Sequence, residues 1–124
     1  MSATQPGTAT IQGAMTLDEF IGQTAAEMSE RTLQTCVLAH ARWLGYKCYH
    51  THNSRHSGAG FPDIVAISRD RNRIWVAELK REGKKPSKAQ AQWLDYFAAV
   101  GIDAYVWTPS SWLSGEIQKI LERE

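Results

Sequence analysis

The segment that most constrains the fold spans residues 62–80, where two apolar runs flank a short polar turn. The runs "PDIVAIS" and "RIWVAELK" are rich in β-branched and aromatic residues, and "RDRN" between them has turn composition. This pattern predicts an antiparallel β-hairpin. If the turn is centred between Asp70 and Arg71, the two strands pair symmetrically about that point. Asp63 then faces Glu78 directly across the hairpin.

Two carboxylates that face each other on one side of a sheet destabilise it unless a cation lies between them. Lys80 lies two residues beyond Glu78 and therefore points to the same face, whereas Leu79 points to the other face with its backbone carbonyl near the acids. Mg²⁺ would balance the pair, because it takes carboxylate and carbonyl oxygens as ligands. The alternative is a solvated strand end in which Asp63 only serves a turn after Pro62. An asymmetric turn or a bulge would change the pairing.

The rest of the chain indicates one α/β domain. Its 124 residues are 43% hydrophobic, which suits a single core. Spacing and capping residues predict helices over 16–28 and 29–44, joined or broken near Ser29, a strand over 46–52, the hairpin, a helix over 87–100, a strand over 102–108 and a last helix from Pro109 with a weak point at Gly115. This order predicts a mixed sheet in a layered domain. Residues 1–15 are expected to form a flexible arm, and residues 16–124 the single domain.

The charge of the chain is unevenly distributed, although the net charge is only +1. Residues 31–94 hold 12 Lys or Arg and four Asp or Glu, a balance of +8, whereas the remainder holds two basic and nine acidic residues, a balance of −7. A basic body suits a nucleic-acid backbone; the alternative is a solvated surface with salt bridges to the acidic ends. The sequence lacks a membrane-spanning run and a signal peptide, and we interpret Cys36 and Cys48 as reduced core residues of a cytoplasmic protein.

The two halves of the hairpin, "PD" and then "ELK" after 14 residues, resemble the PD-(D/E)xK nuclease signature. The segments "SERTLQ", "YHTHNSRHSGAGFPDIV" and "VAELKREGKKPSKAQAQWLDYFAAVGIDAYVWTPSSW" together resemble the virus-type replication-repair nuclease (VRR-Nuc) domain over residues 29–121. The resemblance implies a restriction-endonuclease-like αβββαβ core, with a mixed central sheet flanked by helices. It also implies metal-dependent cleavage of DNA.

The resemblance assigns a role to each residue of the expected site. Asp63 and Glu78 would bind Mg²⁺, or Mn²⁺ in its place, together with the backbone carbonyl of Leu79. Lys80 would orient or activate the attacking water and offset charge in the transition state. Glu30 would support the site directly or through a metal-bound water. The alternative for Glu30 is a first-turn acid that only complements the helix dipole.

Further residues are expected around this centre. Gln90 matches the "S-x-x-Q" pattern of the family and would point towards the acids; the alternative is a capping box with Ser87. The polar loop before Pro62 and the basic loop after Lys80 are expected to contact the DNA backbone, unless they are ordinary solvated loops. The expected DNA-binding residues are Arg55, His52, Lys84, Lys85 and Lys88.

The leading functional hypothesis is a metal-dependent, structure-specific DNA endonuclease that acts as a Holliday-junction resolvase. A four-way junction has two-fold symmetry, which a homodimer would match. A second hypothesis is a nuclease that acts on forks, flaps or single-stranded DNA. A third is a DNA-binding module without catalysis, against which the complete set of expected site residues argues. The expected location is the cytoplasm of a bacterial or phage-infected cell.

Overall fold

The structure is a computed structural model that describes residues 10–11, 15–52 and 59–123. Its elements are β1 (Thr10–Ile11), β2 (Met15–Thr16), α1 (Leu17–Glu27), α2 (Glu30–Trp43), β3 (Lys47–His50), β4 (Ile64–Ser68), β5 (Arg73–Leu79), α3 (Lys88–Ala99), β6 (Asp103–Trp107), α4 (Pro109–Leu113) and α5 (Glu116–Leu121). The strand order of the main sheet is β3-β4-β5-β6. The first two pairs are antiparallel and the last is parallel. The expected αβββαβ core with a mixed sheet is therefore confirmed.

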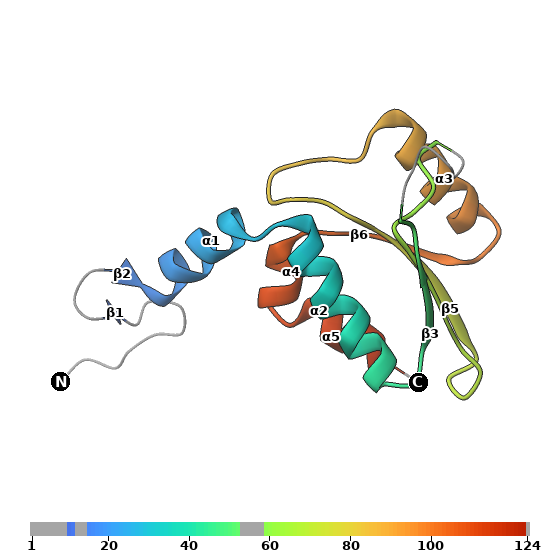
Figure 1. Cartoon of the computed structure of the whole chain (residues 1–124), viewed down its shortest axis with the longest axis horizontal. Coiled ribbons are helices and arrows are strands. Elements are labelled where there is room, and N and C mark those ends of the chain that lie inside the picture. Colours follow the sequence, from blue (N-terminus) through green and yellow to red (C-terminus); the bar gives the residue numbers. More distant parts are fainter. Residues whose placement is uncertain (1–9, 12–14, 53–58, 124) are drawn as a thin grey trace.

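Helices lie on both faces of the sheet (Figure 1). Alternate residues of β4 and β5 point to one face, which we call the inner face, and pack with α2 and α5 into the main hydrophobic core. The opposite, outer face contacts α3 over β5 and β6. α1 extends away from this body and contacts it mainly through α4 (Figure 1). None of the helices in the described ranges is long and apolar enough for a membrane span.

The register of the hairpin is the one that the turn predicts. Ile64 pairs with Ala77 and Ser68 with Arg73, and every pair between them keeps the same symmetry. Asn72, in the turn, adopts a φ of 51°, which Asn tolerates better than most residues. Strand β4 begins one residue after Asp63, so the same register continued by one residue places Asp63 opposite Glu78. The turn is thus symmetric and the pair of acids is formed.

Two helical regions are divided at the positions where the sequence left a break open, near Ser29 and at Gly115. Ser29 ends the first helical region and caps α2 by accepting a hydrogen bond from the N–H of Thr32, so α1 and α2 are separate helices. The last region divides at Gly115, whose φ of 85° suits glycine, into α4 and α5. Cys36 and Cys48 are free thiols, as expected, although both are half-buried rather than fully in the core. The arm expected over residues 1–15 lies mostly outside the described residues.

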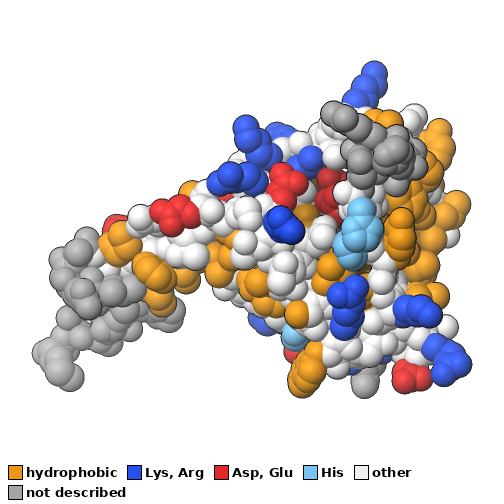
Figure 2. Space-filling view, in the orientation of Figure 1, with side chains coloured by type: hydrophobic (Ala, Val, Ile, Leu, Met, Phe, Trp, Pro, Cys, Tyr) orange, Lys and Arg blue, Asp and Glu red, His pale blue; other side chains and the backbone are white. Residues whose placement is uncertain are grey.

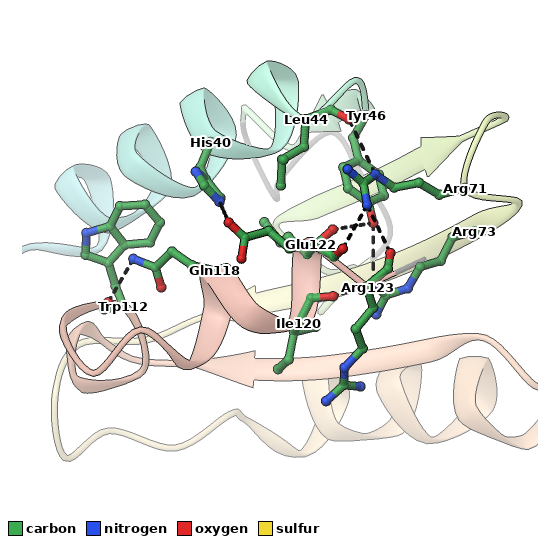
Figure 3. Close-up of polar contacts among 11 residues, drawn as sticks. His40, Leu44, Tyr46, Arg71, Arg73, Trp112, Gln118, Ile120, Glu122 and Arg123 are labelled. Atoms are coloured by element: carbon green, nitrogen blue, oxygen red, sulfur yellow. Dashed lines mark hydrogen bonds and ion pairs between the residues drawn. The ribbon is translucent and has the colours of Figure 1, made fainter.

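The turn end of the hairpin is joined to the C-terminal helix by two guanidinium groups (Figure 3). Arg71 donates to the carbonyls of Glu122 (3.0 Å) and Arg123 (3.1 Å). Arg73 donates to the carbonyl of Ile120 and to the hydroxyl of Tyr105 (3.1 Å). These carbonyls lie at the end of α5, where helix oxygens lack helical partners. The two arginines therefore satisfy the C-terminus of α5 and fasten it to the sheet.

Candidate active site

The hairpin brings Asp63, Glu78 and Lys80 together at its open end. The Oδ2 atom of Asp63 accepts a hydrogen bond of 2.7 Å from the N–H of Leu79. This bond turns the Asp63 carboxylate across the strands towards the end of β5. The Nζ atom of Lys80 lies 3.6 Å from Oε2 of Glu78. The three side chains expected at the centre of the site are thus neighbours.

Glu78 is the most constrained member of the group. Its side chain is only 2% exposed, and among the described residues its Oε1 atom has no hydrogen-bond partner. Burial raises the pKa of Glu78 from 4.5 to about 8; the Asp63 carboxylate contributes in the same direction and the Lys80 ammonium opposes it. One ammonium group is therefore too little positive charge for both carboxylates to be ionised comfortably near neutral pH.

The oxygen atoms at this end of the sheet fit a hard divalent cation. A buried carboxylate oxygen without a partner costs free energy unless something positive or a donor reaches it. Asp63 and Glu78 offer carboxylate oxygens and Leu79 offers a backbone carbonyl, which are the ligand types that Mg²⁺ and Mn²⁺ take. In the described part of the chain, no cluster of three or more His, Cys, Asp or Glu side chains is arranged to hold a metal. The protein ligands would therefore number few, as is usual for Mg²⁺, which keeps several waters.

The backbone at Pro62 and Asp63 is held by Thr51, the residue that directly follows strand β3. The N–H of Thr51 donates to the carbonyl of Asp63 (2.9 Å) and its hydroxyl to the carbonyl of Pro62 (3.0 Å). Pro62 is buried, so the segment enters β4 with a fixed φ and two anchored carbonyls. The position of the Asp63 carboxylate thus depends on Thr51 as well as on the hairpin.

Helix α3 holds the same segment from the outer side, which the sequence did not indicate. Phe61 packs edge-on against Trp93 and Phe97, with ring centroids 5.1 and 6.0 Å apart. The indole N–H of Trp93 donates to the carbonyl of Ala59 (3.0 Å). A Cβ atom at Gly60 would lie 2.6 Å from the backbone of α3, so only glycine allows this approach. In the sequence, Trp93 and Phe97 can be recognised as an aromatic pair one helical turn apart. Nothing in the sequence indicates that Phe61 is the residue that packs against this pair.

The segment after Lys80 is held by contacts with α1 and α4. The guanidinium of Arg81 donates to the carbonyl of Ala26, at the end of α1 (3.2 Å). The carboxylate of Glu82 accepts from the N–H (3.0 Å) and the hydroxyl (2.6 Å) of Ser110, in the first turn of α4. Lys80 itself donates its backbone N–H to the carbonyl of Trp107 (3.0 Å). Both motif segments are therefore anchored immediately outside the acidic centre.

Glu30 begins helix α2, which packs on the inner face of the sheet, whereas Asp63 and Glu78 lie on the outer face. Glu30 is the exposed first residue of α2, where an acid also complements the helix dipole. One turn later, Gln34 approaches the Nδ1 atom of His50 (3.5 Å), and the ring of His50 lies 4.2 Å from that of His52. The contribution of Glu30 to the site stays a prediction, because Glu30 does not join Asp63 and Glu78 in a cluster of three ligands.

Gln90 forms a capping box with Ser87, which is one of the two roles that the sequence suggested for it. Its Oε1 atom accepts from the N–H of Ser87 (2.8 Å), and the Ser87 hydroxyl accepts from the N–H of Gln90 (3.2 Å). Gln90 is half-buried on the side of α3 that carries Leu94, which faces the sheet. The cap is confirmed, whereas a role of Gln90 at the acids stays a prediction.

The expected DNA-binding residues are exposed where the structure describes them. Lys84 and Lys85 lie in the loop before α3, and Lys88 is the first residue of that helix. His52 is exposed after the end of β3, and Arg55 lies outside the described residues. Figure 2 shows acidic side chains flanked by Lys and Arg along the upper edge of the body. Contact of these residues with DNA stays a prediction.

Comparison with known sequences finds one family over most of the chain. The VRR-NUC domain family matches residues 16–110. Two relatives are the "Fanconi-associated nuclease 1 homolog" of Caenorhabditis briggsae, 39% identical over 54 residues, and that of Caenorhabditis elegans, 41% identical over 54 residues. Each alignment covers 44% of this chain and only 6% of the relative. The chain therefore corresponds to a small part of each of these long nucleases.

A comparison of folds agrees with the family match. A solved structure described as a VRR_NUC domain superposes with a TM-score of 0.59 at 23% identity, and the match covers 75% of this chain and 94% of that chain. At this identity the likeness establishes the fold. The family match extends over the paired carboxylates, Lys80, Glu30 and Gln90. The chain belongs to the VRR-NUC domain family and is a nuclease domain.

Proposed function

We propose that this domain is a metal-dependent endonuclease that hydrolyses phosphodiester bonds in branched DNA, with the Holliday junction as its first candidate substrate. The observation that carries the proposal is the opposed pair Asp63 and Glu78 beside Lys80, with one buried Glu78 oxygen left without a partner. A scaffold has no use for such a pair, because like charges placed opposite each other weaken a sheet. The pair suits an enzyme that brings a cation and a phosphodiester to this point.

The residues of the site divide the chemical work. Asp63, Glu78 and the carbonyl of Leu79 would hold Mg²⁺ or Mn²⁺, and Glu30 would add support through a bound water. The metal would lower the pKa of a bound water and polarise the phosphoryl oxygen. Lys80 already lies 3.6 Å from Glu78, so its ammonium group can orient the attacking water and offset charge that develops on the phosphoryl oxygens.

Branched DNA is proposed on the ground of charge and shape. Lys84, Lys85 and Lys88 are exposed around the N-terminus of α3, where backbone N–H groups also favour phosphate. His52 and Arg55 would extend this surface from the loop before β4. We find no groove-entering motif in the sequence, so recognition would rest on backbone and shape. Two copies of the domain would match the two-fold symmetry of a junction and the paired cuts that it needs.

A cleavage assay with labelled substrates tests the proposal. Purified protein is incubated with four-way junction, fork, flap, single strand and duplex, in Mg²⁺, in Mn²⁺ or in EDTA. Asp63→Ala is the variant, and Asp18→Ala, at an exposed Asp in the first turn of α1, is its matched control. We expect paired, symmetric nicks in the junction that need metal, vanish in Asp63→Ala and persist in Asp18→Ala.

The other outcomes separate the competing functions. Cleavage of forks, flaps or single strands in preference to junctions would keep the nuclease and its site and discard the junction. Binding without cleavage in either metal would favour a DNA-binding module and remove the catalytic roles assigned here. Activity that survives Asp63→Ala would place the chemistry elsewhere in the chain.

A further inference from the structure

Helix α3 carries a small hollow on its solvent side that lies outside the acidic centre. In the described part of the chain it is lined by Gln92, Trp93 and Tyr96, which we call the α3 hollow. Its volume is about 190 Å³. A cavity of about 150 Å³ is enough for one benzene ring, whereas drug-sized ligands occupy about 300–1,000 Å³. The α3 hollow therefore has the size for a single flat ring.

The lining of the α3 hollow suits the ring of a nucleobase. Trp93 and Tyr96 offer aromatic rings, on which any base can stack because every base has a π-face. Gln92 adds an amide that can both donate to and accept from the edge of a base. Single exposed aromatic side chains are common on protein surfaces and need no explanation. Here two of them share one concavity with an amide, which is the combination that recognises a flat ring with polar edges.

The indole ring of Trp93 is held in place on its inner side. Its N–H donates to the carbonyl of Ala59 (3.0 Å), and the ring packs edge-on against Phe61 with centroids 5.1 Å apart. Phe97 lies against the same ring at 5.9 Å, tilted by 30°. Trp93 nevertheless keeps 36% of its surface exposed. A ring that is already fixed loses little side-chain entropy when a ligand stacks on it.

Gln92 and Tyr96 lie on the side of α3 that the fold does not use. They are four residues apart and therefore lie one above the other on the same side of the helix. Leu94 is 9% exposed and packs towards the sheet, whereas Tyr96 is 65% exposed and Gln92 is exposed as well. The large ring of Tyr96 thus contributes little to the core and is available to a ligand.

The α3 hollow is adjacent to both parts of the proposed DNA surface. Lys88 precedes Gln92 by four residues, about 6 Å along the helix axis. Phe61, which contacts Trp93, lies two residues before Asp63. Figure 1 shows α3 beside the open end of the hairpin rather than beside its turn. A strand whose phosphate is held at Lys88 therefore has a base within reach of the α3 hollow.

Only an unpaired base can enter such a site. In a duplex both faces of a base are covered by its neighbours, so the base must leave the stack before a side pocket can receive it. The exposed ammonium groups of Lys84, Lys85 and Lys88 complement the phosphates of that strand. A purely apolar ligand would gain nothing from these charges, so the surroundings favour a nucleotide.

We propose that the α3 hollow binds one unpaired nucleobase of the substrate DNA, stacked on Trp93 and Tyr96 with its edge at Gln92. The inference rests on the proposed function and narrows its substrate class. Branched DNA with an unpaired base beside the branch would bind more tightly than a branch in which every base is paired. Tyr96 would be a binding residue that takes no part in the chemistry.

Equilibrium binding in EDTA tests the site without cleavage. One probe is a four-way junction with a single unpaired adenine, placed at each position beside the branch in turn; its partner probe carries an abasic site at the same position. We expect the wild-type chain to bind the adenine probe on the order of 10-fold more tightly at one position, within the range for a stacked base. Tyr96→Ala should bind both probes equally, and Tyr96→Phe, which keeps the ring, should keep the preference.

The matched control is Trp43→Ala, because Trp43 is 79% exposed but lies on α2, on the inner side of the sheet. It should leave the preference for the unpaired base unchanged, and circular dichroism melts establish that each variant is folded. Equal binding of both probes by the wild-type chain at every position would overturn the proposal, as would a preference that survives Tyr96→Ala. In either case metal-dependent cleavage would still support the proposed function. A chain that binds none of these DNAs would remove the proposed function and this site together.

Discussion

The two ends of the β4–β5 hairpin differ in how their charged residues are paired. At the turn end, Arg71 and Arg73 donate to carbonyl and hydroxyl oxygens (Figure 3). Arg73 also lies 3.6 Å from the carboxylate of Asp103. At the open end, Asp63 and Glu78 face each other with a single ammonium nearby, and one Glu78 oxygen has no partner within the described residues. One end is electrostatically complete and the other is not.

This difference separates scaffold from site. Charged groups that serve folding are matched by partners, because an unmatched buried charge costs stability. Groups that serve catalysis are left with perturbed pKa values and free lone pairs, since those are what a substrate or cation engages. In this chain both arrangements occur on the same two strands. Substitutions at the two ends should therefore have opposite effects on activity and stability.

The largest effect is expected for Glu78→Gln. Removing this carboxylate should lower the cleavage rate by on the order of 10²–10³-fold, the usual loss when one electrostatic contribution to a transition state disappears. The folded protein should persist, because the amide replaces a carboxylate that is already costly to ionise. Single-turnover cleavage of the preferred substrate measures the loss.

The control for this prediction is Glu82→Gln, four residues along the chain. Glu82 contacts Ser110 of α4 and lies outside the acidic centre, so its loss should change the cleavage rate far less. Equal losses in the two variants would contradict the division between site and scaffold at this end of the hairpin.

The next largest effect is expected for Arg73→Ala, at the turn end. The substitution leaves the carbonyl of Ile120 and the hydroxyls of Tyr46 and Tyr105 without their charged donor. We expect the free energy of unfolding to fall by about 2–4 kcal/mol, since bonds from a charged group are worth more than neutral ones. Urea denaturation measures the change, and Arg73→Lys should recover part of it by retaining the charge.

Cleavage provides the sharper half of this test. At a temperature where Arg73→Ala is still folded, its single-turnover rate should equal that of the wild-type chain. A rate lowered as far as in Glu78→Gln would mean that the two ends of the hairpin are not independent.

The same contrast explains how much could be learned from the sequence. The hairpin and its register followed from a local signal, a four-residue turn between two apolar runs, and that register alone placed Asp63 opposite Glu78. Caps at Thr16, Ser29 and Ser87 are also local and were found. Local signals thus gave the elements, their order and the centre of the site.

The remaining contacts are long-range and leave no pattern in the sequence. Arg73 and Ile120 are 47 residues apart, and Trp93 and Ala59 are 34 residues apart. Nothing around Arg73 distinguishes a guanidinium that holds a helix end from one that contacts DNA, so the basic middle of the chain could not be divided between these uses. Only the packing of α5 and α3 on the sheet shows which basic residues hold the fold and which are left exposed.

A smaller effect is expected for Gly60→Ala, where scaffold and site meet. The φ of 81° disfavours alanine, and its Cβ would lie 2.6 Å from the backbone of Ala89. We expect a loss of about 2–3 kcal/mol in the free energy of unfolding, because the left-handed conformation costs about 1–2 kcal/mol and the clash adds to it. Gly83→Ala is the matched control: it has the same φ and no atom within 4 Å of its Cβ, so it isolates the conformational cost.

The smallest effect is a pH dependence of stability that belongs to the open end alone. Glu78 has a pKa of about 8 in the folded chain against 4.5 ordinarily, so between these values the folded state holds a proton that the unfolded state releases. Raising the pH from 5 to 6 in EDTA should therefore lower the free energy of unfolding by on the order of 1 kcal/mol, which is the linkage expected for one proton over one pH unit. Thermal melts across this range measure the fall.

Two variants decide whether Glu78 causes that fall. Glu78→Gln cannot ionise and should make the profile flatter. Glu82→Gln should leave it unchanged, because hydrogen bonds from Ser110 lower the pKa of Glu82, and its contribution is lost only at lower pH. Mg²⁺ should raise the melting temperature more at pH 8 than at pH 5 in the wild-type chain, since ionised Glu78 is the form that binds a cation. A fall that persists in Glu78→Gln would mean that another group titrates, and that the open end is not where this fold carries its unmatched charge.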